Sequence, residues 1–118
     1  MRLLIFTLLL LIFSVFSVHA QNLPKIEREF RAVWIATVDN IDFPTEKTLT
    51  IEQQKAEIVK DLELAKSLKM NAVIFQVRPM CDALYESKIE PWSEFLTGKM
   101  GKSQEFDPLK FITEEAHK

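Results

Sequence analysis

Two short, nearly continuous apolar segments on either side of an amphipathic segment constrain the fold of this chain more than any other feature. They occupy residues 32–38 and 72–77, and neither alternates apolar with polar side chains. Continuous apolar runs of this length are typical of strands that are covered on both faces, as in a parallel sheet. A strand, a helix and a strand with short joints form a βαβ unit with parallel strands and a right-handed crossover. The sequence therefore predicts an α/β fold.

The predicted helix between the two strands has a well-marked beginning. Thr50 is a good N-cap, and Gln53 stands where its side chain can complete a capping box. One face carries apolar residues at three- and four-residue steps: Ile51, Ile58, Leu62, Ala65 and Leu68. The other face carries charged residues: Glu57, Lys60, Asp61 and Lys66. The helix is predicted to end near Met70-Asn71, because asparagine is a good left-handed C-cap.

Residues 78–106 contain no long periodic segment. A loop of that length far exceeds the usual ~4–6 residues and is commonly functional. A second helix is predicted to begin at Asp107-Pro108, with Asp as N-cap and Pro in the first helical position. Two strands and two helices cannot cover both edges of a parallel sheet. We therefore expect this chain to be a fragment of a larger α/β protein.

Residues 1–20 have the pattern of a signal peptide. Arg2 supplies the positive start, residues 3–18 are almost all apolar, and small residues stand at the cleavage positions. Cleavage is predicted after Ala20, leaving residues 21–29 as an exposed lead-in. An uncleaved anchor would need about 20 apolar residues, and this run is shorter and contains hydroxyl side chains. The sequence predicts an exported protein, periplasmic or secreted, with no stable membrane span.

Composition excludes several classes of function. The formal net charge of -2 lacks the basic excess of a nucleic-acid-binding protein. Cys81 is the only cysteine, so no internal disulfide can form, and without a nearby histidine we expect a half-buried structural thiol. Two histidines and one cysteine give no metal-ligand spacing. We therefore expect neither a metal nor a cofactor.

Polar and aromatic residues follow both predicted strands, where the active face of parallel α/β proteins lies. After the first strand they are Asp39, Asn40 and Asp42; after the second they are Gln76, Arg78, Asp82, Tyr85 and, farther along, Trp92. Carboxylates, amides and guanidinium groups pair with sugar hydroxyls, and aromatic rings stack on sugar faces. Glycoside cleavage also needs two carboxyl groups about 5–9.5 Å apart. On position alone, the candidates for that pair are Asp39, Asp42, Asp82 and Glu86.

Structural roles compete with each of these assignments. The polar residues after the first strand are explained equally well as turn caps that bond backbone amides: Asp39, Asn40 and Asp42. Arg78 is explained equally well by a structural ion pair with Asp82 or Asp42. Trp34 stands in the middle of a strand and is predicted to lie in the core. Trp92 has the alternative role of packing its loop onto the body of the protein.

Several blocks of the sequence, in order, resemble the glycosyl-hydrolase-like 10 domain family. They cover nearly all of the chain after the leader: Glu29–Val38, Asn40–Pro44, Asn71–Pro79, Asp82–Ser87, Glu90–Ser93, Leu96–Gly98 and Phe106–Leu109. Separate blocks in a fixed order are far more specific than any one short motif. One departure is Phe43, at a position where tryptophan is common, which would weaken stacking if that side chain meets a sugar.

The resemblance implies a TIM-barrel glycosidase of bacterial cell envelopes, of a family associated with cutting peptidoglycan glycan strands that have lost their stem peptides. Residues 30–118 would be the N-terminal part of a (β/α)8 barrel, about two βα units, truncated at 118. The implied substrate-binding residues are Asn40, Asp42, Arg78, Asp82, Tyr85 and Trp92. The catalytic acid and its partner are expected beyond Lys118, so the isolated chain is expected to be inactive.

The leading hypothesis is therefore a fragment of an exported glycoside hydrolase that cleaves O-glycosidic bonds in a polysaccharide, peptide-free peptidoglycan strands in particular. The alternative is a non-catalytic carbohydrate-binding barrel protein that has lost the catalytic carboxylates. A metal-dependent deacylase ranks last, because neither predicted strand ends in histidine. In each of the first two cases the expected partner is a polysaccharide and not a nucleic acid.

Overall fold

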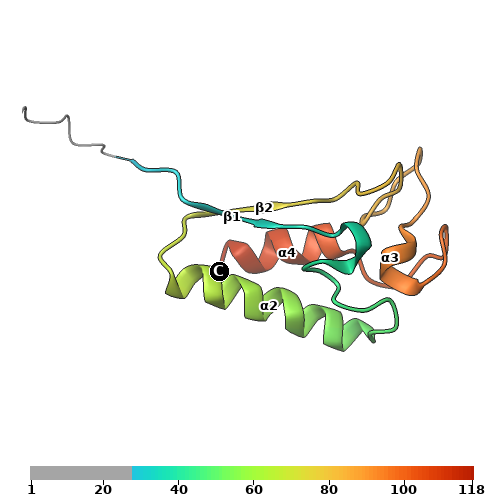
Figure 1. Cartoon of the computed structure of the whole chain (residues 1–118), viewed down its shortest axis with the longest axis horizontal. Coiled ribbons are helices and arrows are strands. Elements are labelled where there is room, and N and C mark those ends of the chain that lie inside the picture. The colour runs from blue at the N-terminus through green and yellow to red at the C-terminus, as the bar shows by residue number, and fades with distance from the viewer. Residues whose placement is uncertain (1–27) are drawn as a thin grey trace, which may run out of the picture.

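The computed structural model describes residues 28–118. They form six elements in chain order (Figure 1): β1 (Ala32–Ile35), η1 (Val38–Asn40), α2 (Ile51–Ser67), β2 (Ala72–Phe75), α3 (Glu94–Thr97) and α4 (Pro108–Ala116). The predicted signal peptide and most of the predicted lead-in lie outside the described residues.

The two strands pair in parallel, in a register that places Ala32 opposite Ala72 and Ile35 opposite Phe75. Helix α2 connects them, so the predicted βαβ unit is confirmed. Both strands are shorter than predicted, because side chains take over the backbone bonding where they end. The Asp42 carboxylate accepts from the Ala36 amide at 2.8 Å, and the Gln76 side chain accepts from the Thr37 amide at 2.8 Å.

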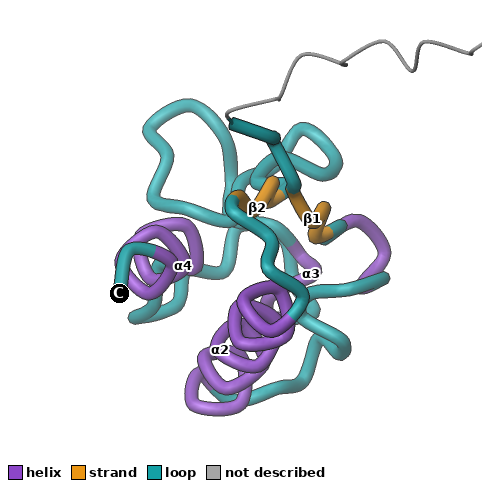
Figure 2. Tube along the Cα trace, turned by 90° about the vertical axis from the view of Figure 1, so that its left-hand side faces the viewer, coloured by secondary structure: helices purple, strands orange, loops and turns teal. Residues whose placement is uncertain are grey.

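Helices α2 and α4 lie on one face of the sheet only (Figures 1 and 2). On that face Ile35, Val73 and Phe75 pack into the core. On the opposite face Trp34 and Ile74 stand beside each other in register and are 57% and 40% exposed. The predictions that both faces are covered and that Trp34 is a core residue are therefore wrong for residues 28–118, because no second layer of this segment covers that face.

Helix α2 begins as the sequence predicts. The Thr50 hydroxyl accepts from the Gln53 amide, and the Gln53 side chain accepts from the Thr50 amide at 2.8 Å, which completes the capping box. Ile58 and Ala65 are buried as predicted, whereas Leu68, at the end of the same face, is 59% exposed. The buried face of α2 therefore ends before Leu68 and is shorter than the apolar pattern suggests.

The end of α2 differs from the prediction. The left-handed residue is Lys69, with φ 57°, two positions before Asn71. The Asn71 side chain instead accepts from the Arg31 amide at 2.9 Å and donates to the Glu29 carbonyl. Asn71 therefore ties the beginning of β2 to the segment before β1 and does not cap the helix.

The core lies between the sheet, the two long helices and the loop that contains α3. Its buried members are Ile35, Phe43, Ile58, Leu84, Leu96, Phe106 and Ile112. Helix α4 begins as predicted, because the Asp107 carboxylate accepts from the Lys110 amide at 2.9 Å and Pro108 follows the cap. The carboxyl ends of the strands and the amino ends of α2 and α4 lie at the same end of the molecule (Figure 1).

Candidate functional site

The ends of β1 and β2 are fastened to each other by a small buried polar contact. Thr37 is fully buried, and its hydroxyl donates to the Gln76 carbonyl at 2.7 Å. The Gln76 side chain accepts from the amides of Thr37 and Val38 at 2.8 and 3.1 Å. The two loops that carry the predicted site residues therefore leave the sheet from one edge, as the sequence predicts. Gln76 fixes the position of the first loop, because its side chain and its carbonyl both accept hydrogen bonds from that loop.

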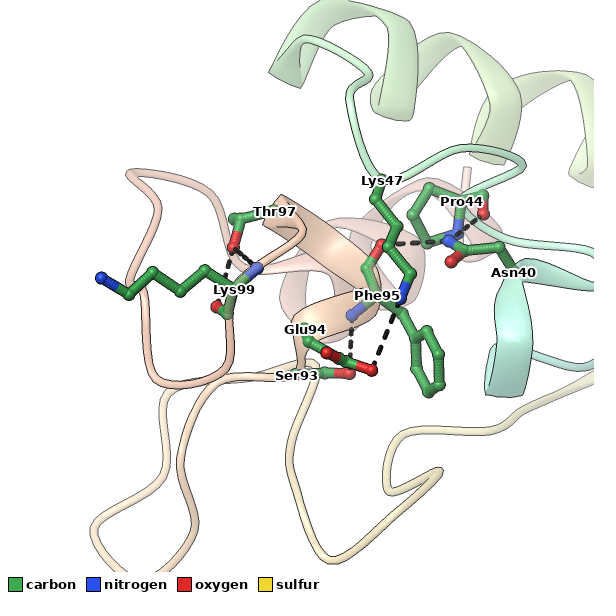
Figure 3. A network of polar contacts seen from close by, with 8 residues as sticks. All are labelled: Asn40, Pro44, Lys47, Ser93, Glu94, Phe95, Thr97 and Lys99. Atoms are coloured by element: carbon green, nitrogen blue, oxygen red, sulfur yellow. Dashed lines mark hydrogen bonds and ion pairs between the residues drawn. The ribbon is translucent and has the colours of Figure 1, made fainter.

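Asn40 lies between its own loop and α3 (Figure 3). Its amide group donates to the carbonyls of Pro44 and Phe95, at 2.6 and 3.0 Å. Both of its N–H donors are thus used inside the protein, across 55 residues of sequence in one case. Of the two roles that the sequence left open for Asn40, the structure supports the one in which it stabilises the turn.

Asp42 stabilises the same loop from the other side. One of its carboxylate oxygens accepts from the Ala36 amide at 2.8 Å, and the carbonyl of Ala36 accepts from the Asp42 and Phe43 amides. The side chain remains exposed at the surface, where it lines a groove together with Asp61. Phe43, by contrast, is fully buried in the core and has no surface on which a sugar could stack.

Arg78 forms an ion pair with Glu90 and not with Asp82 or Asp42, the two partners that the sequence suggested. The guanidinium is 59% exposed, whereas the Glu90 side chain is 13% exposed. The hydrogen bond and charge of Glu90 raise the pKa of Arg78 above its ordinary value, with smaller contributions from Tyr85 and Cys81. The loop after β2 thus pairs Arg78 with Glu90, a partner that the sequence analysis missed. Tyr85, on the same loop, is half-buried.

Asp82 has no solvent-exposed surface. One carboxylate oxygen accepts from the Met80 amide at 2.9 Å, and the other has no hydrogen-bond partner within the described residues. In this conformation a ligand cannot reach Asp82. Its observed contact is to the backbone of its own turn. Cys81 beside it is exposed, so the predicted half-buried thiol is wrong.

Trp92 is half-buried and joins the loop to the body of the protein. It forms an isolated parallel bridge with Ala83 and packs against the core. Part of its surface lines a cleft of about 590 Å³ at the amino end of α4. The other lining residues include Lys55, Glu86, Gln104, Phe106, Asp107, Lys110 and Phe111. The anchoring role that the sequence left open for Trp92 is therefore observed, and the residue also borders a cavity.

The cleft beside Trp92 combines aromatic rings with carboxylates, an amide and ammonium groups. The Lys55 ammonium lies 5.3 Å from the Phe106 ring centroid and 5.8 Å from that of Phe111. The Asp107 carboxylate is occupied by the amides of Glu86 and Lys110, whereas the Glu86 side chain is exposed. Hydroxyl-rich ligands suit such a surface, because it offers both apolar faces and hydrogen-bonding groups of both kinds.

The six predicted site residues therefore do not converge on one pocket in residues 28–118. Arg78 pairs with Glu90, Tyr85 is half-buried in the same loop, and Trp92 borders the cleft near α4. The other three are held by the backbone or buried: Asn40, Asp42 and Asp82. Within the same segment, no group of three or more histidine, cysteine, aspartate or glutamate side chains is placed to hold a metal ion. No helix of this segment is long and apolar enough to span a bilayer.

Comparison with known proteins supplies the family. A family model described as Glycosyl hydrolase-like 10 matches residues 29–118. "Glycosyl hydrolase YngK" of Bacillus subtilis strain 168 is 50% identical over 103 residues, which cover 87% of this chain and 19% of that protein. "Glycosyl hydrolase DigH" of Escherichia coli K12 is 43% identical over 96 residues, which cover 75% of this chain and 22% of that protein.

The chain thus spans about a fifth of the length of the curated relatives that it matches. The matched region contains every residue that the sequence analysis selected as a site candidate. Because the family model covers most of the sequence, the chain belongs to the glycosyl hydrolase-like 10 family.

Proposed function

We propose that this chain is the N-terminal part of an exported glycoside hydrolase with a (β/α)8 barrel, which cleaves O-glycosidic bonds in a polysaccharide. Peptide-free glycan strands of peptidoglycan are the substrate that the family resemblance suggests. Export rests on the leader at residues 1–20, with cleavage after Ala20. The barrel rests on the parallel βαβ unit followed by a second helix on the same face of the sheet.

The observation that carries the proposal is the cleft beside Trp92. It is lined by Lys55 of α2 and by Lys110 and Phe111 of α4. The amino ends of these two helices lie at the end of the molecule that carries the carboxyl ends of the strands (Figure 1), where barrel enzymes keep their active sites. A tryptophan, exposed carboxylates and an amide border the same cavity. In this proposal the Trp92 ring packs against a sugar face, and Arg78 and Tyr85 on the same long loop bind sugar hydroxyls.

Hydrolysis needs a carboxylic acid that protonates the leaving oxygen and a carboxylate that acts as base or nucleophile. Two of the carboxylates suggested by position bond the backbone of their own turns, Asp42 through Ala36 and Asp82 through Met80. Glu86, on the rim of the cleft, has an exposed side chain. We therefore assign substrate binding to this region, and the catalytic pair to segments of the longer protein that follow Lys118.

The direct test is an assay of the full-length protein on peptide-free glycan strands, with new reducing ends as the readout. We expect cleavage, and we expect Trp92→Ala to raise KM more than it lowers kcat, because stacking on a bound sugar acts before the chemical step. Trp92→Phe is the matched control, since it keeps an aromatic face. Absence of cleavage on these and other glycans by a folded protein would refute the proposal.

The second candidate is a carbohydrate-binding barrel without catalytic activity. The observation that favours it is the backbone-bonded state of Asp42 and Asp82, which leaves few free carboxylates at the strand ends of this segment. The two candidates differ in whether the full-length protein cleaves the glycan that it binds, and in whether it has the carboxylates to do so. If the full-length protein binds glycan strands and releases no reducing ends, and its later strand ends lack Asp and Glu, the binding function is correct.

A further inference from the structure

The cleft beside Trp92 is lined by side chains of α2, the long loop and α4, all within residues 28–118. Three aromatic residues border it: Trp92, Phe106 and Phe111. The rings of Phe106 and Phe111 meet edge to face, with their centroids 5.5 Å apart. Aromatic faces suit many ring-shaped ligands, so the charged groups around the cleft decide which of them binds.

Negative charge prevails around the cleft. Four carboxylates line it against two ammonium groups: Glu86, Glu105, Asp107 and Glu114 against Lys55 and Lys110. The Asp107 carboxylate accepts from two backbone amides. The other three belong to exposed residues and form no ion pair within residues 28–118. A cleft with an excess of carboxylates attracts cations and repels anions.

The two phenylalanine rings already hold a cation. The Lys55 ammonium lies 5.3 Å from the Phe106 centroid and 5.8 Å from the Phe111 centroid, both within the ~6 Å reach of a cation–π interaction. In the part of the chain that the structure describes, Lys55 forms no ion pair with a carboxylate. Because its side chain is flexible and its ammonium is readily hydrated, Lys55 can leave the rings for water when another cation arrives.

We infer that the cleft beside Trp92 is a subsite for an amino sugar with a free, positively charged amino group. The ammonium of the sugar takes the place of Lys55 over the two phenylalanine rings, beside the exposed carboxylates. The Trp92 ring packs against the sugar ring. An N-acetylated sugar carries no charge at this position and gains neither electrostatic contact. The inference rests on the proposed function in taking a glycan as the ligand, and it names the substrate class as glycans with de-N-acetylated sugars.

Calorimetric titration of the full-length protein with two β-1,4-linked hexamers, one of glucosamine and one of N-acetylglucosamine, tests the preference for charge. We expect the glucosamine hexamer to bind at least about tenfold more tightly, because only its ammonium groups interact with the rings and the carboxylates. Added salt should reduce this preference, since it screens exposed carboxylates. Equal affinities, tighter binding of the N-acetylated hexamer or binding of neither hexamer would overturn the inference.

Lys55→Met distinguishes binding in the cleft from a general attraction of a cationic glycan to the protein surface. The substitution removes the ammonium that competes for the rings and keeps a side chain of similar length. We expect about threefold tighter binding of the glucosamine hexamer and an unchanged affinity for the N-acetylated hexamer. Lys60→Met, at an exposed lysine of α2 that lines none of the cavities of this segment, is the matched control and should change neither affinity.

Two results with these variants would contradict the subsite. An equal gain in affinity for Lys60→Met would mean that net charge alone attracts the glycan. A loss of affinity for both hexamers in Lys55→Met would mean that Lys55 itself binds sugar hydroxyls. Glycosidase activity is measured separately, as reducing ends released from peptide-free strands. Cleavage without a preference for the glucosamine hexamer removes the subsite and leaves the proposed function in place, whereas the preference without cleavage supports the subsite and the carbohydrate-binding alternative.

Discussion

The loops that follow β1 and β2 leave the sheet at the same end, and both contain a carboxylate that bonds the backbone, Asp42 in the first and Asp82 in the second. They differ in the other polar residues that the sequence selected. In the first loop, Asn40 and Asp42 bond backbone groups, and Phe43 is fully buried. In the second loop, Arg78 is exposed and its partner is a side chain. Position at a strand end therefore does not by itself make a residue functional. The first loop stabilises the fold, and the second is the better candidate for ligand binding.

Phe43→Ala should have the largest effect on stability of any change in either loop. The side chain is fully buried, and its ring centroid lies 5.6 Å from that of Phe75. Removal of a buried phenylalanine leaves a cavity and lowers the free energy of unfolding by about 3–5 kcal/mol. Urea denaturation of the purified protein measures this. Phe30→Ala is the control, because that side chain is 74% exposed and should change stability little.

Asn40→Asp should be the next largest change. The substitution keeps the shape of the side chain and removes both N–H donors, so the carbonyls of Pro44 and Phe95 lose a partner. We expect a loss of about 2 kcal/mol in the free energy of unfolding, the usual cost of leaving buried polar groups unpaired. Urea denaturation again provides the measurement. If the stability is unchanged while glycan binding is lost, Asn40 is a ligand-binding residue and the comparison between the loops fails.

The parts of the fold that the sequence predicts correctly depend on local signals. The capping box of Thr50 and the cap of Asp107 involve residues three positions apart, so they can be recognised without tertiary structure. The parts it misses depend on distant contacts. The side chain of Asn71 bonds residues about 40 positions away, and the exposure of Trp34 reflects which layers cover the sheet.

The candidate site follows the same rule. Both loops could be located from the sequence, because polar residues directly follow two apolar runs. Which residues stay free could not be predicted, since Glu90 pairs with Arg78 across twelve residues of an aperiodic loop. The burial of Asp82 likewise depends on how that loop folds over the core. The sequence offers one weak signal for Glu90: it is an acidic residue on the same loop as Arg78, and it stands between Ile89 and Pro91.

Arg78→Ala should have the smallest effect on stability and thus sharpens the comparison most. The guanidinium is 59% exposed, so solvent screens the ion pair, although the Glu90 carboxylate that loses its partner is only 13% exposed. We expect a small fall in the urea midpoint, and at least about a tenfold loss in affinity of the full-length protein for glycan strands, because hydrogen bonds from a charged group to sugar hydroxyls are lost. Glu90→Gln distinguishes direct binding of the sugar by Arg78 from a requirement for the intact ion pair, since it weakens the ion pair and leaves the guanidinium in place. If Glu90→Gln reduces affinity as much as Arg78→Ala does, the ion pair orients the arginine. If neither variant affects binding, the second loop is as structural as the first, and the glycan contacts must lie elsewhere in the protein.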